Sequence, residues 1–260
     1  LLQPTARASE RLAQPSTDFA LHVAEAQALL KQAAHDFQPL KQASSLGAED
    51  VVITHLINQL QLDVPVFVLD TGALHHQTLA LLERQQASGR WALEVHRPQH
   101  EQVIHWVARH GQNAIFDSIE QRKDCCRVRK LEPLASALQG QTAWITGLRR
   151  EQSDARAEVP LIDDSEVKTT GRTKYNPLVR WTWGDVWHFI ASQQIDYNPL
   201  HDDFYPSIGC APCTRAISLG EPFRAGRWWW ESPDTKECGL HVVDGKLVRI
   251  KSVTNELPTS

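Results

Sequence analysis

Long apolar runs are absent from the chain, and so is any surplus of positive charge. No run approaches the roughly 18–20 residues that a membrane-spanning helix needs, and no signal-peptide pattern opens the sequence. The net charge of −4 disfavours a general nucleic-acid-binding protein, which normally carries a basic surplus. We therefore expect a cytoplasmic protein that has neither a membrane nor a nucleic acid as partner.

Cysteine is missing from the first 124 residues. The five cysteines form two close pairs and one single residue, namely Cys125 with Cys126, Cys210 with Cys213, and Cys238. Such clustering indicates metal or redox chemistry rather than a secreted disulfide scaffold. The four paired thiols suit a structural zinc ion or a [4Fe–4S] cluster. Zinc ligands usually stand two to four residues apart within a pair, whereas Cys125 and Cys126 are adjacent.

Short apolar strands alternate with helices over most of the chain, which predicts an α/β fold with a mostly parallel, twisted sheet flanked by helices. Residues 64–70 form a continuous apolar run, typical of a strand buried on both faces. Further strands are expected to end near residue 45 and to occupy 91–95 and 142–146. Helices are expected at 18–37, 49–60, 74–86 and 101–110, from Ser118 past the first cysteine pair, and after a capping box at Thr182.

Composition divides the chain into three parts. Residues 1–18 are polar with scattered proline, which predicts a loose lead-in. Residues 19–215 carry the α/β pattern and both cysteine pairs. Residues 216–260 lack clear periodicity, and we expect a mobile tail that carries Cys238.

Two strand–helix turns carry residues suited to an anionic ligand. Ser44, Ser45 and Gly47 follow the first strand, and a second turn follows the run at 64–70. Free N–H groups at such turns bind phosphate or sulfate, and open parallel sheets bind ligands at the carboxyl ends of their strands. The second turn comprises Leu69, Asp70, Thr71 and Gly72. A glycine turn alone is a weak signal, but two turns at one sheet edge favour a nucleotide.

Seven segments, taken together and in order, resemble the iron–sulfur-containing adenylyl-sulfate (APS) reductases of the PAPS/APS reductase family. They are CCRVRKLEPL (125–134), TGLRREQS (146–153), KYNPL (174–178), YNPLH (197–201), IGCAPCTR (208–215), GRWWWE (226–231) and KECGLH (236–241). One position departs from the pattern: the first turn of related enzymes often reads Ser-x-Ser-Gly, and Leu46 precedes Gly47 here.

The resemblance implies an adenine nucleotide alpha-hydrolase-like fold and an enzyme of assimilatory sulfate reduction. It implies that Cys125, Cys126, Cys210 and Cys213 hold a [4Fe–4S] cluster. Cys238 is then the nucleophile, which attacks the sulfur of adenylyl sulfate, releases AMP and becomes an S-sulfocysteine. Thioredoxin, the implied electron donor, releases sulfite from that adduct.

Cations are expected around the phosphosulfate, because negative charge shifts toward the bridging oxygen as AMP leaves. The candidates are Lys130, Arg149, Arg150, Arg156, Arg224 and Arg227. Lys130 follows Cys126 by four residues, so on a helix both side chains share one face. Of Arg149 and Arg150, we expect at least one to contact substrate.

Three alternatives stay open from the sequence. The first is reduction of the 3′-phosphorylated nucleotide (PAPS), alone or together with APS. The second is an ATP pyrophosphatase-type enzyme, but its Ser-Gly-Gly-x-Asp-Ser turn is not present at Gly47. The third is a zinc-stabilised binding module. The oligomeric state is also open, with a homo-oligomer as one option.

Overall fold

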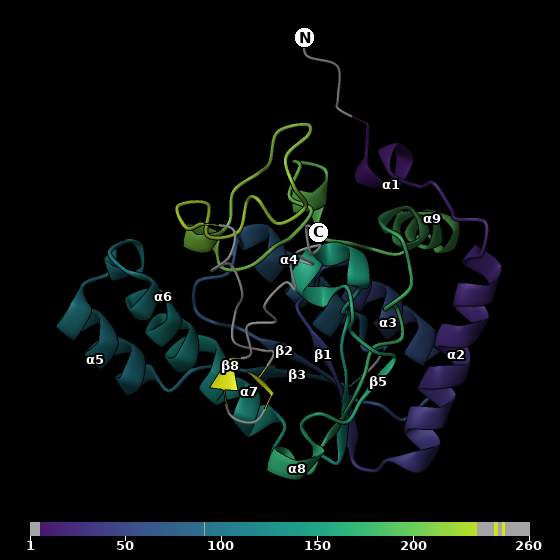
Figure 1. Cartoon of the computed structure of the whole chain (residues 1–260), viewed down its shortest axis with the longest axis horizontal. Helices are drawn as coiled ribbons and strands as arrows, with labels where there is room; N and C mark the ends of the chain where they lie inside the picture. Colours follow the sequence, from purple (N-terminus) through teal and green to yellow (C-terminus); the bar gives the residue numbers. More distant parts are fainter. Residues whose placement is uncertain (1–5, 91, 233–241, 244–245, 248–260) are drawn as a thin grey trace, which may run out of the picture.

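A six-stranded, mostly parallel sheet forms the centre of the molecule (Figure 1). This computed structural model describes residues 6–90, 92–232, 242–243 and 246–247. The strands lie in the order β3-β2-β1-β4-β6-β5, and only β5 runs antiparallel to its neighbour. The predicted α/β fold is confirmed. The strands are β1 (Leu40–Ser44), β2 (Val66–Leu69), β3 (Leu93–His96), β4 (Ala143–Ile145), β5 (Ile162–Asp163) and β6 (Thr173–Tyr175).

The helices predicted from the sequence begin and end within a few residues of the expected bounds, and the short helices α1 and α8 were not predicted. The helices in chain order are α1 (Ala8–Arg11), α2 (Phe19–Asp36), α3 (Ala48–Gln59), α4 (His76–Ser88), α5 (His100–His110), α6 (Ile119–Cys126), α7 (Glu132–Ala137), α8 (Val167–Thr170) and α9 (Trp183–Gln193). A separate antiparallel pair joins β7 (Val242–Val243) to β8 (Lys246–Leu247). Among the described helices, none has the length and apolar character needed to cross a membrane.

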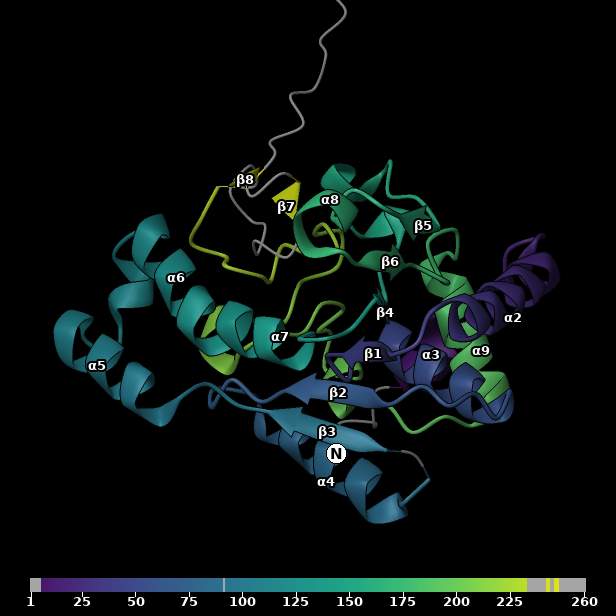
Figure 2. The same ribbon diagram turned by 90° about the horizontal axis from the view of Figure 1, so that it is seen from below.

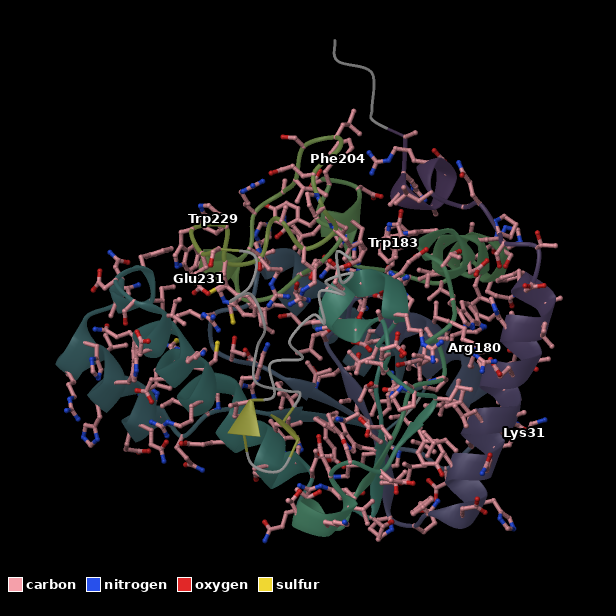
Figure 3. The ribbon with its side chains drawn as sticks, in the orientation of Figure 1. Lys31, Arg180, Trp183, Phe204, Trp229 and Glu231 are labelled. Carbon is pink, nitrogen blue, oxygen red and sulfur yellow. The ribbon has the colours of Figure 1, made fainter. Side chains whose placement is uncertain are left out.

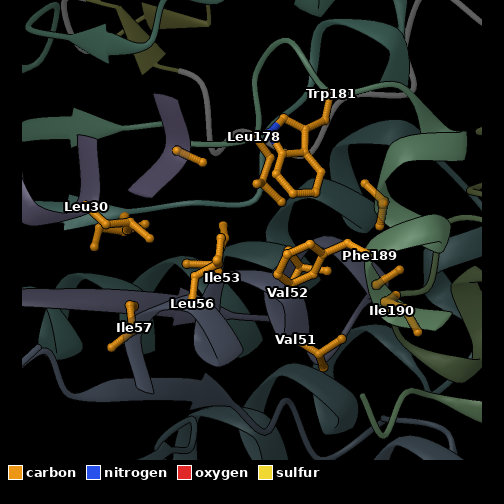
Figure 4. Packing of buried hydrophobic residues seen from close by; sticks show 14 of the residues in the cluster. Leu30, Val51, Val52, Ile53, Leu56, Ile57, Leu178, Trp181, Phe189 and Ile190 are labelled. Carbon is orange, nitrogen blue, oxygen red and sulfur yellow. The ribbon is translucent and has the colours of Figure 1, made fainter. Parts of the chain in front are cut away.

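Two unequal apolar layers cover the sheet. Helices α2, α3 and α9 supply most of the larger one, in which Leu30, Ile53 and Phe189 are among the buried side chains (Figure 4). The smaller layer lies on the opposite face, where Phe67 and Trp144 meet α7. Figure 2 shows α7 and α4 on opposite sides of β2 and β3. Alternate side chains of a strand point to opposite faces, so each layer takes every second residue.

The described part of the predicted lead-in, residues 6–18, is packed against the domain rather than loose. The amide of Ala8 donates to Asp202 Oδ1 at 2.6 Å. The amide and hydroxyl of Ser16 donate to the two oxygens of Asp185, at 2.6 and 3.0 Å. Asp185 is wholly buried and also closes the capping box of α9 with Thr182. One carboxylate thus joins the start of α9 to the N-terminal segment, a long-range contact that composition does not reveal.

The cysteine-bearing helix contains a wider turn. The Ser118 hydroxyl accepts a hydrogen bond from the amide of Gln121 and so begins α6, as the sequence predicts. Between α6 and α7 the backbone of residues Arg127–Leu131 forms a π-helix. Such turns occur often at functional sites. Here the wider turn lies directly after Cys126 and includes Lys130.

The described part of the predicted tail, residues 216–232, is also packed. Arg122 of α6 forms a bidentate ion pair with Glu231, with N–O distances of 2.8 and 2.7 Å. Both side chains are buried, with 1% and 3% exposure. The Arg122 guanidinium also lies 4.5 Å from the ring centroid of Trp228, which is itself buried. This ion pair holds the chain on the cysteine helix up to Glu231.

We expect Asp185→Asn to lower the free energy of unfolding by about 1–3 kcal/mol at neutral pH, because the amide would leave buried donors of Ser16 and Thr182 unpaired. Burial raises the pKa of Asp185, but hydrogen bonds from Ser16 and Thr182 outweigh it, so the folded-state pKa is lowered. The stabilisation is therefore present above the unfolded-state pKa, about 4, and is lost as pH falls through the folded-state pKa. Urea unfolding across this range measures both effects. Asp196→Asn is the control, since its ion pair with Arg84 is about half exposed and should contribute less than about 1 kcal/mol.

Glu231→Gln should lower the free energy of unfolding by about 3–5 kcal/mol, because it leaves the Arg122 charge buried without its carboxylate. Glu221→Gln offers a matched control in the same segment, since the Arg215–Glu221 pair is also bidentate but 39% and 30% exposed. Its cost should be about 1 kcal/mol or less. Equal losses in the two variants, measured by urea unfolding, would contradict the anchoring role of the Arg122–Glu231 pair.

Candidate functional site

All four paired cysteines line one cavity of about 370 Å³, here called the cysteine cavity. Cys125 and Cys126 come from the end of α6, while Cys210 and Cys213 flank a short 3-10 turn at Ala211–Cys213. Figure 3 shows the sulfur atoms between α6 and the segment that ends at Glu231. The two pairs are separated by 83 residues in sequence and meet because the C-terminal segment folds back onto α6.

The geometry of these thiols bears on what they can hold. The described residues contain no group of three or more His, Cys, Asp or Glu side chains arranged around a single metal ion. A tetrahedral zinc site needs four ligands within about 2.3 Å of one point. Burial raises the pKa of Cys213 to about 12, and neighbouring Cys210 and Cys126 raise it further. Burial likewise raises the pKa of Cys125. Crowded, buried thiols of this kind suit a cationic iron cluster, in which each iron takes one thiolate.

A second cavity of about 240 Å³, here called the sheet-edge cavity, lies at the carboxyl ends of β1, β2 and β4. It adjoins the cysteine cavity, because Thr71, Leu74, Lys130, Cys210 and Arg227 line both. The site residues predicted from the sequence that line it are Ser44, Ser45, Gly47, Leu69, Thr71, Lys130, Arg156, Arg224 and Arg227. The structure therefore brings nine of the thirteen predicted substrate-binding residues to one cavity.

The first turn holds its two serines by internal hydrogen bonds. Ser44 Oγ accepts from the amide of Leu46 at 3.1 Å, and Ser45 Oγ donates to Asp50 Oδ2 at 2.7 Å. Leu46 has a positive φ of 60°, which is uncommon for a leucine, and its side chain is buried in the larger apolar layer. The departure from the family pattern at Leu46 thus adds a core contact, while Ser45 and Gly47 on either side line the cavity.

Two buried carboxylates, Glu49 and Asp50, also line the sheet-edge cavity, and sequence reasoning did not assign them to the site. Burial raises the pKa of Asp50 to about 6, although hydrogen bonds from Ser45 lower it. Asp50 lies so close to Gly147 that a Cβ there would come within 2.3 Å of Asp50 Oδ1. Glycine at 147 therefore lets the turn after β4 approach the turn after β1.

The second turn divides its residues between the two cavities. Leu69 and Thr71 line the sheet-edge cavity, whereas Gly72 lines the cysteine cavity with Thr71. Thr71 Oγ1 lies 3.2 Å from Cys210 Sγ, within hydrogen-bonding distance. Asp70 lines neither cavity. Its carboxylate accepts from the amide of Gly72 and from Arg97 Nε, so it stabilises the turn instead.

Four of the six predicted cations line a cavity. Lys130 and Arg227 lie where the two cavities adjoin, and Arg156 and Arg224 line the sheet-edge cavity. Lys130 and Cys126 both face the cysteine cavity, despite the π-turn between them. Arg227 is buried and lies so close to Gly209 that a Cβ there would come within 2.5 Å of its guanidinium.

Arg149 and Arg150 line neither cavity, which differs from the position expected from their sequence. Arg149 is wholly buried and donates to Glu49 and to the backbone carbonyl of Trp181. Arg150 is exposed, and its Nε donates to the carbonyl of Val159. Their neighbours Leu148 and Gln152 do line the sheet-edge cavity.

Further cavity residues were not assigned to the site from the sequence. Among them are Trp144, Lys174, His201 and Phe223. Burial lowers the pKa of His201 to about 4, so the ring is neutral, and its Nδ1 lies 2.7 Å from the carbonyl of Tyr205. Lys174 and His201 stand within the KYNPL and YNPLH segments, so those segments contained the signal. Trp144 follows no such signal, because a buried strand residue reads as ordinary core.

The predicted nucleophile, Cys238, lies outside the described residues. Glu231 is seven positions before it and is buried beside the cysteine cavity.

Comparisons with known proteins show the family to which the chain belongs. Residues 39–216 match the phosphoadenosine phosphosulfate reductase domain family. An adenosine 5′-phosphosulfate reductase of Allochromatium vinosum is 49% identical over 213 residues, which cover 82% of each chain. One of Burkholderia cepacia is 48% identical over 225 residues, covering 86% of this chain and 89% of the relative.

A solved structure supports the fold independently. The phosphoadenylyl-sulfate reductase of Candida auris, in a phosphate complex, superposes with a TM-score of 0.62 at 24% identity, covering 78% of this chain and 98% of that one. At this identity the likeness concerns the fold alone. The domain match and the two close relatives go further, and they show that this chain belongs to the PAPS/APS reductase family.

Proposed function

We propose that this protein reduces adenylyl sulfate to sulfite and AMP in assimilatory sulfate reduction, in the cytoplasm, with thioredoxin as electron donor. The proposal rests on one observation, namely that the sheet-edge cavity lies directly beside the cysteine cavity. A nucleotide in the sheet-edge cavity would place its anionic end beside Lys130 and Arg227, next to the four thiols. The names of the relatives supply the substrate class.

The proposed chemistry transfers the sulfonate group from the nucleotide to Cys238 and then releases it as sulfite. The Cys238 thiolate attacks the sulfur of the phosphosulfate, the bond from that sulfur to the bridging oxygen breaks, and AMP leaves with the electron pair. A thioredoxin thiolate then attacks the sulfur atom of Cys238 and releases sulfite. This attack leaves Cys238 and thioredoxin joined by a mixed disulfide. The second thioredoxin thiol cleaves that bond, so the Cys238 thiolate is released and thioredoxin, now a disulfide, has supplied the two electrons.

The residues lining the sheet-edge cavity would bind and orient the nucleotide. Lys130, Arg156, Arg224 and Arg227 line this cavity, and their positive charges would stabilise the charge that develops on AMP as it leaves. Arg227 is preorganised, because its Nη1 donates to Ser207 Oγ at 3.3 Å and to the Ile208 carbonyl at 3.1 Å. A group already fixed in place loses little freedom when the anion binds.

Cys125, Cys126, Cys210 and Cys213 would hold a [4Fe–4S] cluster. When bound, the cluster would supply electrostatic and positioning effects beside the anion, without a requirement to transfer electrons. Lys130 would lie between that group and the nucleotide, since it faces both cavities.

Mixing the protein with adenylyl sulfate, without reductant, should add the mass of one SO₃ group to Cys238. Mass spectrometry of the intact and digested protein measures this, because the adduct persists until a thiol attacks it. The Cys238→Ser variant should acquire no such mass. An unmodified Cys238 in protein that binds the nucleotide would contradict the mechanism, and a parallel turnover assay with PAPS would show whether both nucleotides are substrates.

Anaerobically purified protein should be brown and contain about four iron atoms per chain, since four cysteines are available as ligands. Cys213→Ser should lose iron, because Cys213 is a buried member of the four-thiol set. Cys238→Ser should retain it and is the matched control. Zinc in place of iron, or equal iron loss in both variants, would contradict the assignment.

A further inference from the structure

Arg156, one of the cations that line the sheet-edge cavity, is hydrogen-bonded to a neighbouring glutamine. Its Nη1 donates to Oε1 of Gln152, which stands four residues earlier in the chain. The two residues end successive 3-10 turns, Arg150–Gln152 and Asp154–Arg156. Gln152 also lines the cavity, although only 9% of it is exposed. A buried amide therefore contacts a cation of the proposed nucleotide site.

The partners of Gln152 determine which way its amide lies. Its Nε2 donates to Glu49 Oε1 at 2.9 Å and to the carbonyl of Gly147 at 3.2 Å. Carboxylate and carbonyl oxygens only accept, so the NH₂ group has to face them. The Oε1 atom then faces two donors, the guanidinium of Arg156 and the backbone amide of Arg149, the latter at 3.2 Å. With acceptors on one side and donors on the other, the amide has a single favourable orientation.

Glu49 fixes the inner end of this series of hydrogen bonds. It lies in the first turn of α3 and is 7% exposed, and its Oε1 also accepts from Nε of the wholly buried Arg149 at 2.9 Å. The series thus runs from a buried ion pair, through the amide of Gln152, to Arg156 at the cavity. A guanidinium that is already held by a fixed acceptor loses less freedom when an anion binds to it.

The absence of charge on Gln152 matters as much as its position. Arg149 donates to two carboxylates, those of Glu49 and Glu151. Gln152 instead accepts from Arg156 through a neutral amide, which brings no negative charge of its own to the cavity. A carboxylate at position 152 would repel an incoming anion, and the repulsion is strongest where little water screens it.

We infer that Gln152 is a positioning residue, which orients Arg156 toward the phosphosulfate of the bound nucleotide without adding negative charge to the site. The inference rests on the proposed function, since it requires an anionic nucleotide in the sheet-edge cavity. It gives Gln152 a role in substrate binding, exerted through Arg156, in addition to its part in closing its own turn.

The test measures binding of adenylyl sulfate to iron-loaded Cys238→Ser protein by isothermal titration calorimetry, because this variant should not form the S-sulfocysteine. Gln152→Met keeps the length of the side chain but removes its donor and its acceptor. It should weaken binding about tenfold, the loss expected for one hydrogen bond to a charged group. In protein that already carries Arg156→Ala, Gln152→Met should have almost no further effect, because the side chain that it orients is gone.

Comparing the two backgrounds separates positioning from a purely structural role. If Gln152 only closed its turn, Gln152→Met would weaken binding by the same factor with and without Arg156, and that result would overturn the inference. Gln42→Met is the matched control, because Gln42 is also buried, donates to the Asp50 carbonyl, accepts from the Thr54 hydroxyl and lines neither cavity. It should lower the free energy of unfolding and leave the affinity for adenylyl sulfate unchanged.

A second variant covers the case in which Gln152→Met does not fold. Gln152→Glu keeps the size of the side chain and an acceptor for Arg156, but it adds a negative charge. It should weaken binding of adenylyl sulfate at least about tenfold, although Arg156 keeps its partner. Binding as tight as in the parent protein would show that the inference is wrong. Failure of the Cys238→Ser protein to bind adenylyl sulfate at all would contradict the proposed function as well, which separates the two outcomes.

Discussion

Parallel pairing of β1, β2 and β4 is the constraint on which the rest of the site depends. Parallel strands end at the same edge, so the turns that follow Ser44, Leu69 and Ile145 meet there although a hundred residues separate the first from the last. Gly147 allows the third turn to approach Asp50 of the first more closely than any side chain would permit. Cys210 lies at the same edge, because the backbone amide of the next residue, Ala211, donates a hydrogen bond to the carbonyl of Ala73. The sheet edge and the cysteine cavity are therefore parts of one structure.

Charge is distributed unevenly around this edge, and the distribution explains which arginines line the sheet-edge cavity. Glu49 and Asp50 lie in a cavity expected to bind an anion, so their own charges have to be compensated. Arg149 donates to Glu49 at 2.9 Å, as does the Gln152 amide, and this occupies Arg149 inside the protein. The arginines that line the cavity are Arg156, Arg224 and Arg227. The Arg122–Glu231 pair holds that C-terminal segment against α6, and thus keeps Arg227 beside the four cysteines.

Much of the fold could be predicted from local pattern. The apolar run at 64–70 became β2, with its first three residues buried, and the Thr182 capping box begins α9 as expected. The sequence predicted that the two turns share one sheet edge and that the two cysteine pairs form one set. In the structure residues of both turns line the sheet-edge cavity, and the four cysteines line the cysteine cavity. The packing of residues 6–18 and 216–232 could not be predicted. It depends on buried carboxylates, Asp185 and Glu231, whose partners lie more than one hundred residues away in the chain.

The sequence by itself determined the residue types and spacings: four thiols in two pairs, glycine-containing turns after buried strands, and the seven segments of the family. Only the tertiary structure decided the direction in which each side chain points. Arg149 and Arg156 are seven residues apart, yet Arg149 is enclosed beside Glu49 while Arg156 lines the cavity. Trp144 reads as core in the sequence and lies at the cavity wall with an unpaired N–H. The physical reason is that burial and pairing are properties of the whole packed molecule, whereas a motif encodes only local backbone preference and chemistry.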